Sequence, residues 1–132
     1  MTVTIWHNPA CGTSRNALAM IRATGVEPII VEYLKDVPGA EQLAAVAAAV
    51  GGATELLRVK GTPAEALGLI GADDSAILAA MAAHPILINR PVVFGPKGIV
   101  LARPSEKLLT VLDGSLPQDF TKEDGEKVGR PA

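Results

Sequence analysis

The stretch TVTIWHNPACGTSRNALAMIRATG, residues 2–25, predicts how the chain begins to fold. The β-branched and aromatic segment Thr2–His7 is typical of a strand. NPACGT interrupts it, and we expect a helix of about three turns to run from Ser14 to a stop at Gly25. EPIIVEYL follows as a second strand, whose apolar run Ile29–Val31 suits a strand buried on both faces. Together these segments predict a right-handed βαβ unit.

The rest of the chain predicts helices, then a hairpin and a last helix. From Ala40 to His84 the sequence has helical spacing and high helix propensity, with TELLRVKG typical of a short helix and TPAEALGLIG partly helical. VVFGPKGIVLA predicts two short strands around Gly95–Gly98, and RPSEKLLTVLDG predicts an amphipathic helix. This order indicates an α/β protein with a thioredoxin-like fold, in which a βαβ unit, a helical insertion and a ββα unit share a mixed central sheet.

The C-terminal segment LPQDFTKEDGEKVGRPA is polar. It predicts a short surface helix with a capping element over Thr121–Asp124, and we expect Glu123 and Asp124 to be solvated. The sequence shows no internal repeat and no sign of a second domain. We therefore expect a single domain over residues 1–132, with the helical insertion at about residues 40–84.

Composition excludes several classes of function. Twelve basic against fourteen acidic residues, a net charge of -2, disfavour a nucleic-acid surface, and one Trp, one Tyr and two Phe offer no stacking platform for single strands. No apolar run approaches the roughly 20 residues that cross a membrane. One Cys and two His are too few for a closed zinc site, so we expect no metal. A lone cysteine without a secretory leader favours the cytoplasm.

The single cysteine stands in HNPACGTSRN, between a strand end and a helix start. Unpaired backbone N–H groups and the helix dipole at such a position lower the pKa of a thiol and attract anions. His7 and Arg15 could each stabilise the Cys11 thiolate. Gly12 would allow a ligand to approach the backbone closely, and Ser14 or its neighbour could cap the helix. The alternative, an inert buried thiol, fits poorly with these polar neighbours.

Counting cysteines limits the redox chemistry. Ser14 stands where a C-x-x-C motif would have its second cysteine, and the chain contains no other thiol. No internal disulfide can form. An oxidised or adducted Cys11 must therefore be resolved by a thiol from another molecule.

Several separate motifs resemble one family. HNPACGTSRN, LLRVK, ILINRPVV, ARPSEKLL and FTKEDGEKV follow in order between about residues 3 and 128, and they are similar to the glutaredoxin-coupled arsenate reductases of the ArsC type. The resemblance implies a thioredoxin-like fold with a helical insertion. It also implies reduction of arsenate to arsenite with glutathione as co-substrate and glutaredoxin as partner, without a bound cofactor.

The resemblance also implies roles for individual residues. Cys11 would be the nucleophile, His7 would lower its pKa, and Pro91 would form the cis peptide bond that thioredoxin-like folds place beside the cysteine loop. Three arginines would bind the oxyanion: Arg58 in LLRVK, Arg90 in INRP and Arg103 in ARPSE.

Elementary chemistry agrees with an arginine site for arsenate. Planar guanidinium groups bind tetrahedral oxyanions bidentately and stay charged at any working pH. An arbitrary arginine is more often a solvated surface charge, and only the matched motifs favour binding at these three positions. Arg15 could touch the anion or only favour the thiolate, while Gly12 and Ser14 are expected to hold the loop.

Two other functions remain open. A regulatory branch of the same superfamily contacts RNA polymerase and senses thiol stress, usually with two cysteines where this chain has Cys11 and Ser14. A monothiol glutaredoxin-like transferase would act on glutathione mixed disulfides. The arginine set counts against both, and the helical insertion counts against the transferase. We therefore expect an arsenate reductase that attacks arsenic through Cys11.

Overall fold

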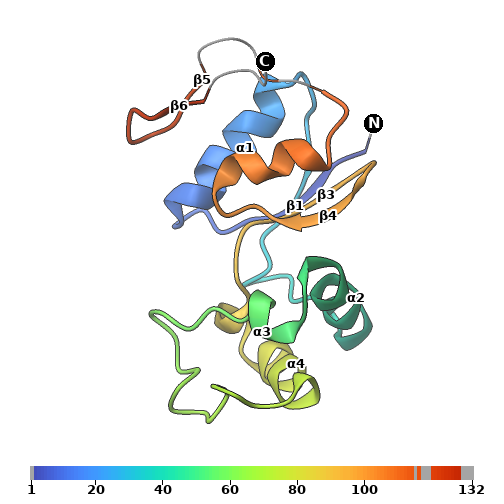
Figure 1. The fold of residues 1–132 in the computed structure, drawn as a ribbon, viewed down its shortest axis with the longest axis vertical. Helices are drawn as coiled ribbons and strands as arrows, with labels where there is room; N and C mark the ends of the chain where they lie inside the picture. The colour runs from blue at the N-terminus through green and yellow to red at the C-terminus, as the bar shows by residue number, and fades with distance from the viewer. Residues whose placement is uncertain (1, 115, 117–119, 129–132) are drawn as a thin grey trace. The chain divides into compact units, whose positions relative to one another are not determined.

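The computed structural model describes residues 2–114, 116 and 120–128. The chain divides into two compact units, one made of Met1–Val31 with Arg90–Ala132 and the other of Glu32–Asn89 (Figure 1). The first unit contains the four-stranded sheet, and the second contains the helices that lie in the sequence between the second and third strands of that sheet. Whether the whole chain behaves as a single domain stays a prediction.

The sheet of the first unit is mixed. It has four strands in the order β2-β1-β3-β4, namely β1 (Thr4–Trp6), β2 (Ile29–Val31), β3 (Val92–Gly95) and β4 (Gly98–Leu101). β1 pairs with β2 in parallel and with β3 in the antiparallel sense, and β3 and β4 form the predicted antiparallel hairpin. Helix α1 (Gly12–Ala23) connects β1 to β2, which gives the predicted βαβ unit.

One prediction about the sheet is wrong. Ile29 and Ile30 of β2 are 56% and 39% exposed, so this strand is not buried on both faces. β2 lies at the edge of the four-stranded sheet, whereas β1 lies inside it with Ile5 and Trp6 fully covered. A short apolar run shows that a strand can be buried, but only the strand order decides whether neighbours cover it.

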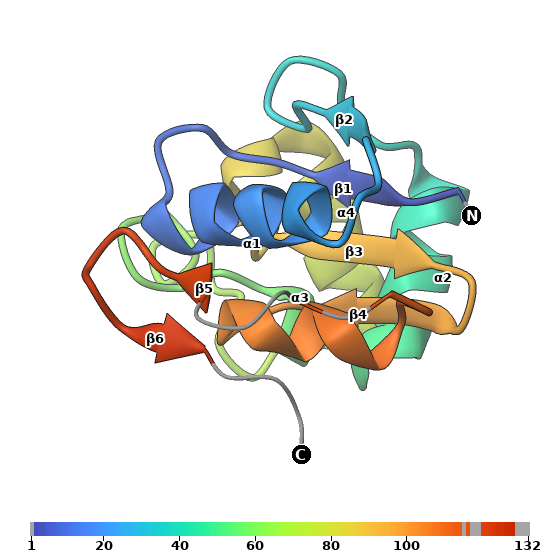
Figure 2. The same ribbon diagram turned by 90° about the horizontal axis from the view of Figure 1, so that it is seen from above.

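The core of the first unit lies between the sheet and two helical segments. Figures 1 and 2 show α1 and η2 (Ser105–Thr110) on the same face of the sheet, side by side. η2 is a 3-10 helix and covers only the middle of the amphipathic helix predicted there. The buried cluster between these elements contains Val3, Ile5, Ala17, Met20, Ile21, Val93, Ala102, Leu108, Val111, Leu112 and Leu116.

The second unit is helical, as predicted, but its helices cover fewer residues than the sequence predicts. It contains α2 (Ala40–Val50), α3 (Ala53–Leu56), α4 (Asp74–Ala83) and η1 (Pro85–Leu87). α2 ends at Gly51, whose φ of 106° is the left-handed conformation that glycine adopts readily, and Asp73 caps α4 by accepting a hydrogen bond from the Ala76 amide at 2.9 Å.

Two helix predictions in this unit are wrong in extent. α3 stops at Leu56, because Leu57 forms an isolated antiparallel bridge with Ile88. TPAEALGLIG, predicted to be partly helical, forms turns. Among the described residues, no helix has both the length and the apolar character needed to cross a bilayer.

The described part of the C-terminal segment is a hairpin rather than the predicted surface helix. β5 (Phe120–Thr121) pairs with β6 (Lys127–Val128) in the antiparallel sense, so the capping element predicted from Thr121 is wrong. Gly125 turns the chain with a φ of 91°, and the Lys122 amide donates to the Glu126 carbonyl at 2.8 Å. Residues 117–119 and 129–132 of the predicted helix and tail lie outside the described part.

Candidate active site

Cys11 occupies the N-cap position of α1. The preceding loop is ordered by its own hydrogen bonds: the Asn8 side chain accepts from the Ala10 amide at 3.0 Å, and the Asn8 carbonyl accepts from the Cys11 amide at 3.0 Å. The Cys11 carbonyl then accepts the helical bond from the Arg15 amide. The thiol therefore lies where the free N–H groups of the first helical turn are directed, and Cys11 is only 9% exposed.

The surroundings of Cys11 favour its thiolate. Burial acts to raise the pKa of the Cys11 thiol, but four groups outweigh it: the backbone N–H of Ser14, the charge of Arg90, a hydrogen bond from Arg103 and the backbone N–H of Thr13. The pKa of Cys11 is consequently lower than that of an ordinary thiol. A depressed pKa at a helix N-terminus is the usual way to activate a cysteine nucleophile.

Arg103 contacts the thiol, and the charge of Arg90 acts on it as well. Arg103 Nη1 lies 3.9 Å from Cys11 Sγ and donates a hydrogen bond to the Arg90 carbonyl at 2.9 Å. The Arg90–Pro91 peptide bond is cis, as expected, and Arg103–Pro104 is a second cis bond that no sequence motif indicated. The Pro91 carbonyl accepts from the Ala102 amide at 2.9 Å, which joins the two arginine segments.

His7 is tied to Ser14. His7 Nδ1 and Ser14 Oγ are 2.6 Å apart in a buried hydrogen bond, and the Asn8 amide donates to the same hydroxyl at 3.0 Å. Because the Ser14 backbone N–H also faces the thiol, Ser14 joins the end of β1 to the cysteine loop. This agrees with the loop-holding role expected of Ser14. The effect of His7 on the pKa of Cys11 stays a prediction.

Arg15 binds Glu123 and the backbone of the cysteine loop. Its Nε lies 2.8 Å from Glu123 Oε2, its Nη2 donates to Glu123 Oε1 at 3.0 Å, and its Nη1 donates to the Pro9 carbonyl at 2.8 Å. Glu123 is exposed, as expected, but its ion pair with Arg15 was not predicted. The hydrogen bond and charge of Arg15 lower the pKa of the Glu123 carboxyl. No local pattern could have revealed this pair, since 108 positions separate its members.

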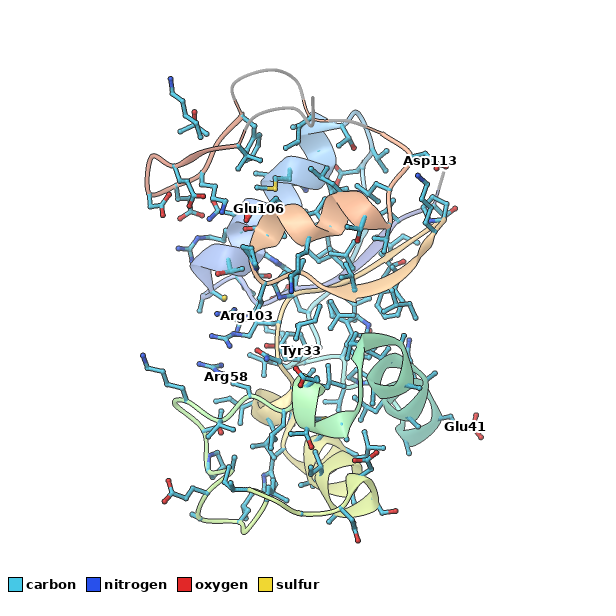
Figure 3. The ribbon with its side chains drawn as sticks, in the orientation of Figure 1. Tyr33, Glu41, Arg58, Arg103, Glu106 and Asp113 are labelled. Carbon is cyan, nitrogen blue, oxygen red and sulfur yellow. The ribbon has the colours of Figure 1, made fainter. Side chains whose placement is uncertain are left out.

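Arg58 belongs to the helical unit. Figure 3 shows it on the segment that follows α3. Its amide donates to the Leu87 carbonyl at 2.8 Å, beside the bridge between Leu57 and Ile88, and its Nε donates to the Lys60 carbonyl at 3.2 Å. The backbone of Arg58 is thus held against the strand-like stretch that leads into Asn89.

Gly12 begins α1 next to the thiol. A β-carbon placed on Gly12 would have one close neighbour, Arg15 Nη2 at 3.7 Å, which is ordinary contact. The fold itself therefore leaves room for a side chain here, and a glycine at this position keeps the backbone open to a ligand. Across residues 2–114, 116 and 120–128, no three His, Cys, Asp or Glu side chains gather to hold a metal ion.

Comparison with known proteins assigns the family. The model of the ArsC family matches residues 6–111, which include the cysteine loop and all four arginines discussed above. The chain belongs to the ArsC family. An arsenate reductase of Rhizobium meliloti is 54% identical over 131 residues, covering 97% of this chain and 94% of the relative. An arsenate reductase of Escherichia coli is 49% identical over 129 residues, covering 96% and 92% respectively.

A solved ArsC-family structure supports the same assignment. The arsenate reductase from Vibrio cholerae superposes with a TM-score of 0.80 at 35% identity, covering 85% of this chain and 98% of that one. Together with the mixed sheet and its βαβ start, this confirms the predicted thioredoxin-like α/β fold.

Proposed function

We propose that this ArsC-family protein is an arsenate reductase with Cys11 as its nucleophile. The observation that carries the proposal is the cysteine at the N-terminus of α1, with Arg103 Nη1 3.9 Å from its sulfur and a pKa lowered by its surroundings. A buried, activated thiol beside fixed cations suits attack on a tetrahedral oxyanion. The names of the relatives point to arsenate as that oxyanion.

The proposed reaction begins with the Cys11 thiolate. Its sulfur forms a bond to arsenic(V), and one arsenate oxygen leaves as water after taking up protons. Glutathione attacks the adduct, and a second water leaves. A glutaredoxin thiolate then attacks the glutathione sulfur, so that these two sulfurs form a disulfide and two electrons pass to arsenic. Water finally displaces arsenic(III) from Cys11, which releases arsenite and restores the thiol.

Both external thiols follow from the single cysteine. Cys11 can form no disulfide within the chain, so the two electrons must come from other molecules. We propose glutathione as co-substrate and glutaredoxin as protein partner. We also propose a cytoplasmic location. The cytoplasm keeps thiols reduced, and Cys11 must be reduced to act as the nucleophile.

We assign oxyanion binding to Arg58, Arg90 and Arg103. Arg90 and Arg103 act on the thiol itself, which supports roles for both at the reacting atom. Arg58 carries the motif LLRVK that pointed to the same role. Guanidinium groups would hold arsenate through charge-assisted hydrogen bonds, and the N–H groups of the first turn of α1 would add to them.

The test is a coupled assay with glutathione, glutaredoxin, glutathione reductase and NADPH. We expect NADPH oxidation that depends on arsenate, is lost in Cys11→Ser, and is reduced in Arg58→Ala. Arg22→Ala is the matched control, because Arg22 lies on α1 but pairs with Glu27 through Nε at 2.9 Å. Full turnover by Cys11→Ser would disprove the mechanism. Activity on glutathione mixed disulfides without any on arsenate would instead indicate a thiol transferase.

A further inference from the structure

The hairpin formed by β5 and β6 comes from FTKEDGEKV, a motif that the proposed reaction leaves without a role. Its partly buried residues Phe120 and Val128 pack against the core of the first unit. The two charged residues that follow β5, Lys122 and Glu123, make contacts with two different elements of the active site.

Lys122 anchors the hairpin to η2. Its side chain is only 7% exposed, and its Nζ lies 2.7 Å from Glu106 Oε2 and 3.4 Å from Glu126 Oε2. Glu106 follows the Arg103–Pro104 bond by two residues, and Figure 3 shows Arg103 and Glu106 pointing in different directions from this short stretch. The hairpin is therefore fastened to the segment that supplies Arg103.

Glu123 contacts the other element, the N-terminus of α1. Both of its carboxylate oxygens accept from Arg15, and its backbone amide donates to the Asn16 side chain at 2.9 Å. The second end of the Arg15 guanidinium is held by the Pro9 carbonyl at 2.8 Å. The Arg15 guanidinium thus bridges Glu123 of the hairpin and the Pro9 carbonyl of the cysteine loop.

Arg15 lies close enough to the thiol for the two charges to interact. It stands four residues after Cys11, and its Nη2 already passes 3.7 Å from the β-carbon position of Gly12. The thiolate charge of Cys11 contributes, after the hydrogen bond and charge of Glu123, to raising the pKa of Arg15. An Arg15 side chain freed from the Glu123 carboxylate would be attracted to the thiolate, or to an oxyanion bound beside it.

We propose that Glu123 is a positioning residue that neutralises Arg15 and holds it out of the oxyanion site. The oxyanion is then bound by Arg58, Arg90 and Arg103 without Arg15. Among these three, Arg103 is oriented by the hydrogen bond that its Nη1 donates to the Arg90 carbonyl at 2.9 Å. The inference rests on the proposed use of Cys11 as an oxyanion-binding nucleophile. It assigns a positioning function to the C-terminal hairpin.

The direct test measures Cys11 without requiring turnover. The pH profile of its alkylation by iodoacetamide reports the pKa of the thiol, and protection by inorganic phosphate reports anion binding. For Glu123→Gln we expect a lower pKa of Cys11, because Arg15 loses its counter-ion, and several-fold tighter protection by phosphate. Glu123→Asp keeps the carboxylate and should stay close to the wild type.

Two further variants separate charge from structure. Glu27→Gln breaks the Arg22–Glu27 pair, a more exposed ion pair near the other end of α1, and should change neither the pKa of Cys11 nor the protection by phosphate. The double variant Arg15→Gln with Glu123→Gln removes both charges and should return the pKa of Cys11 and phosphate protection toward the wild type. Thermal unfolding of each variant checks the fold, which an exposed ion pair affects little.

Three results would overturn the proposal. These are an unchanged alkylation profile and phosphate protection in a folded Glu123→Gln variant, a raised pKa of Cys11 in that variant, or a double variant that behaves like Glu123→Gln. None of them depends on arsenate turnover. An absence of arsenate reduction in the wild type would instead contradict the proposed function.

Discussion

Arg103 connects the Cys11 thiol to the backbone of Arg90, because its Nη1 lies 3.9 Å from Cys11 Sγ and 2.9 Å from the Arg90 carbonyl oxygen. The carbonyl orients the guanidinium while the cationic group faces the sulfur. Such an arrangement is set before a substrate binds, which is what makes a fixed cation effective in stabilising a charged reacting group.

Replacing Arg103 by alanine should weaken both the nucleophile and the oxyanion site. The pKa of Cys11 is expected to rise, because a hydrogen bond to its thiolate is lost. At neutral pH we expect arsenate turnover to fall by about 100-fold or more, the usual cost of removing a preorganised donor. Coupled assays over a pH series measure both effects. A variant with the wild-type profile would show that Arg103 does not act on the thiolate.

The wild-type protein should be alkylated at Cys11 at lower pH than an ordinary thiol, whose pKa is about 8.5. Stability should follow the same titration. Because the pKa of Cys11 is lower in the folded than in the unfolded chain, the unfolded chain binds more protons between the two values. The free energy of unfolding should therefore rise with pH across this window, and Cys11→Ser should remove that contribution. Urea unfolding at several pH values measures it.

Gly12→Ala tests whether the ligand approaches the loop backbone. A β-carbon at Gly12 meets only ordinary contact with Arg15 Nη2, so the fold should tolerate it, with a stability change within about 0.5 kcal/mol. If arsenate uses the amides at the start of α1, the added methyl group should raise KM about tenfold or more. An unchanged KM in the folded variant would mean that the oxyanion does not come close to Gly12.

Lys122→Met should destabilise the C-terminal hairpin. The Lys122 side chain is 7% exposed and lies 2.7 Å from Glu106, so its loss leaves a partly buried carboxylate without this cation. We expect the free energy of unfolding to fall by about 1–3 kcal/mol, as for other buried polar groups that lose a partner. Lys35→Met is the control, because Lys35 is 81% exposed in its contact with Glu32. Equal stability of the two variants would contradict the anchoring role.

Local sequence signals predicted most of the fold. Local propensity and turn chemistry act over a few residues. They therefore predicted the strand at Thr2–His7, the break at NPACGT and the helix that follows. The helical middle and the hairpin around Gly95–Gly98 followed for the same reason. The prediction for the C-terminal segment was wrong. FTKEDGEKV contains a helix-capping pattern, but Gly125 and the packing of Phe120 and Val128 favour a hairpin.

By itself, then, the sequence determined the position of Cys11 at a strand-to-helix junction and its lack of an internal redox partner. Both depend on neighbours along the chain or on a count of thiols. Only the tertiary structure decided that Arg103 and Arg90 act on that thiol, that Arg15 pairs with Glu123, and that β2 is an exposed edge strand. These relationships join residues far apart in sequence, and no local propensity encodes such distances.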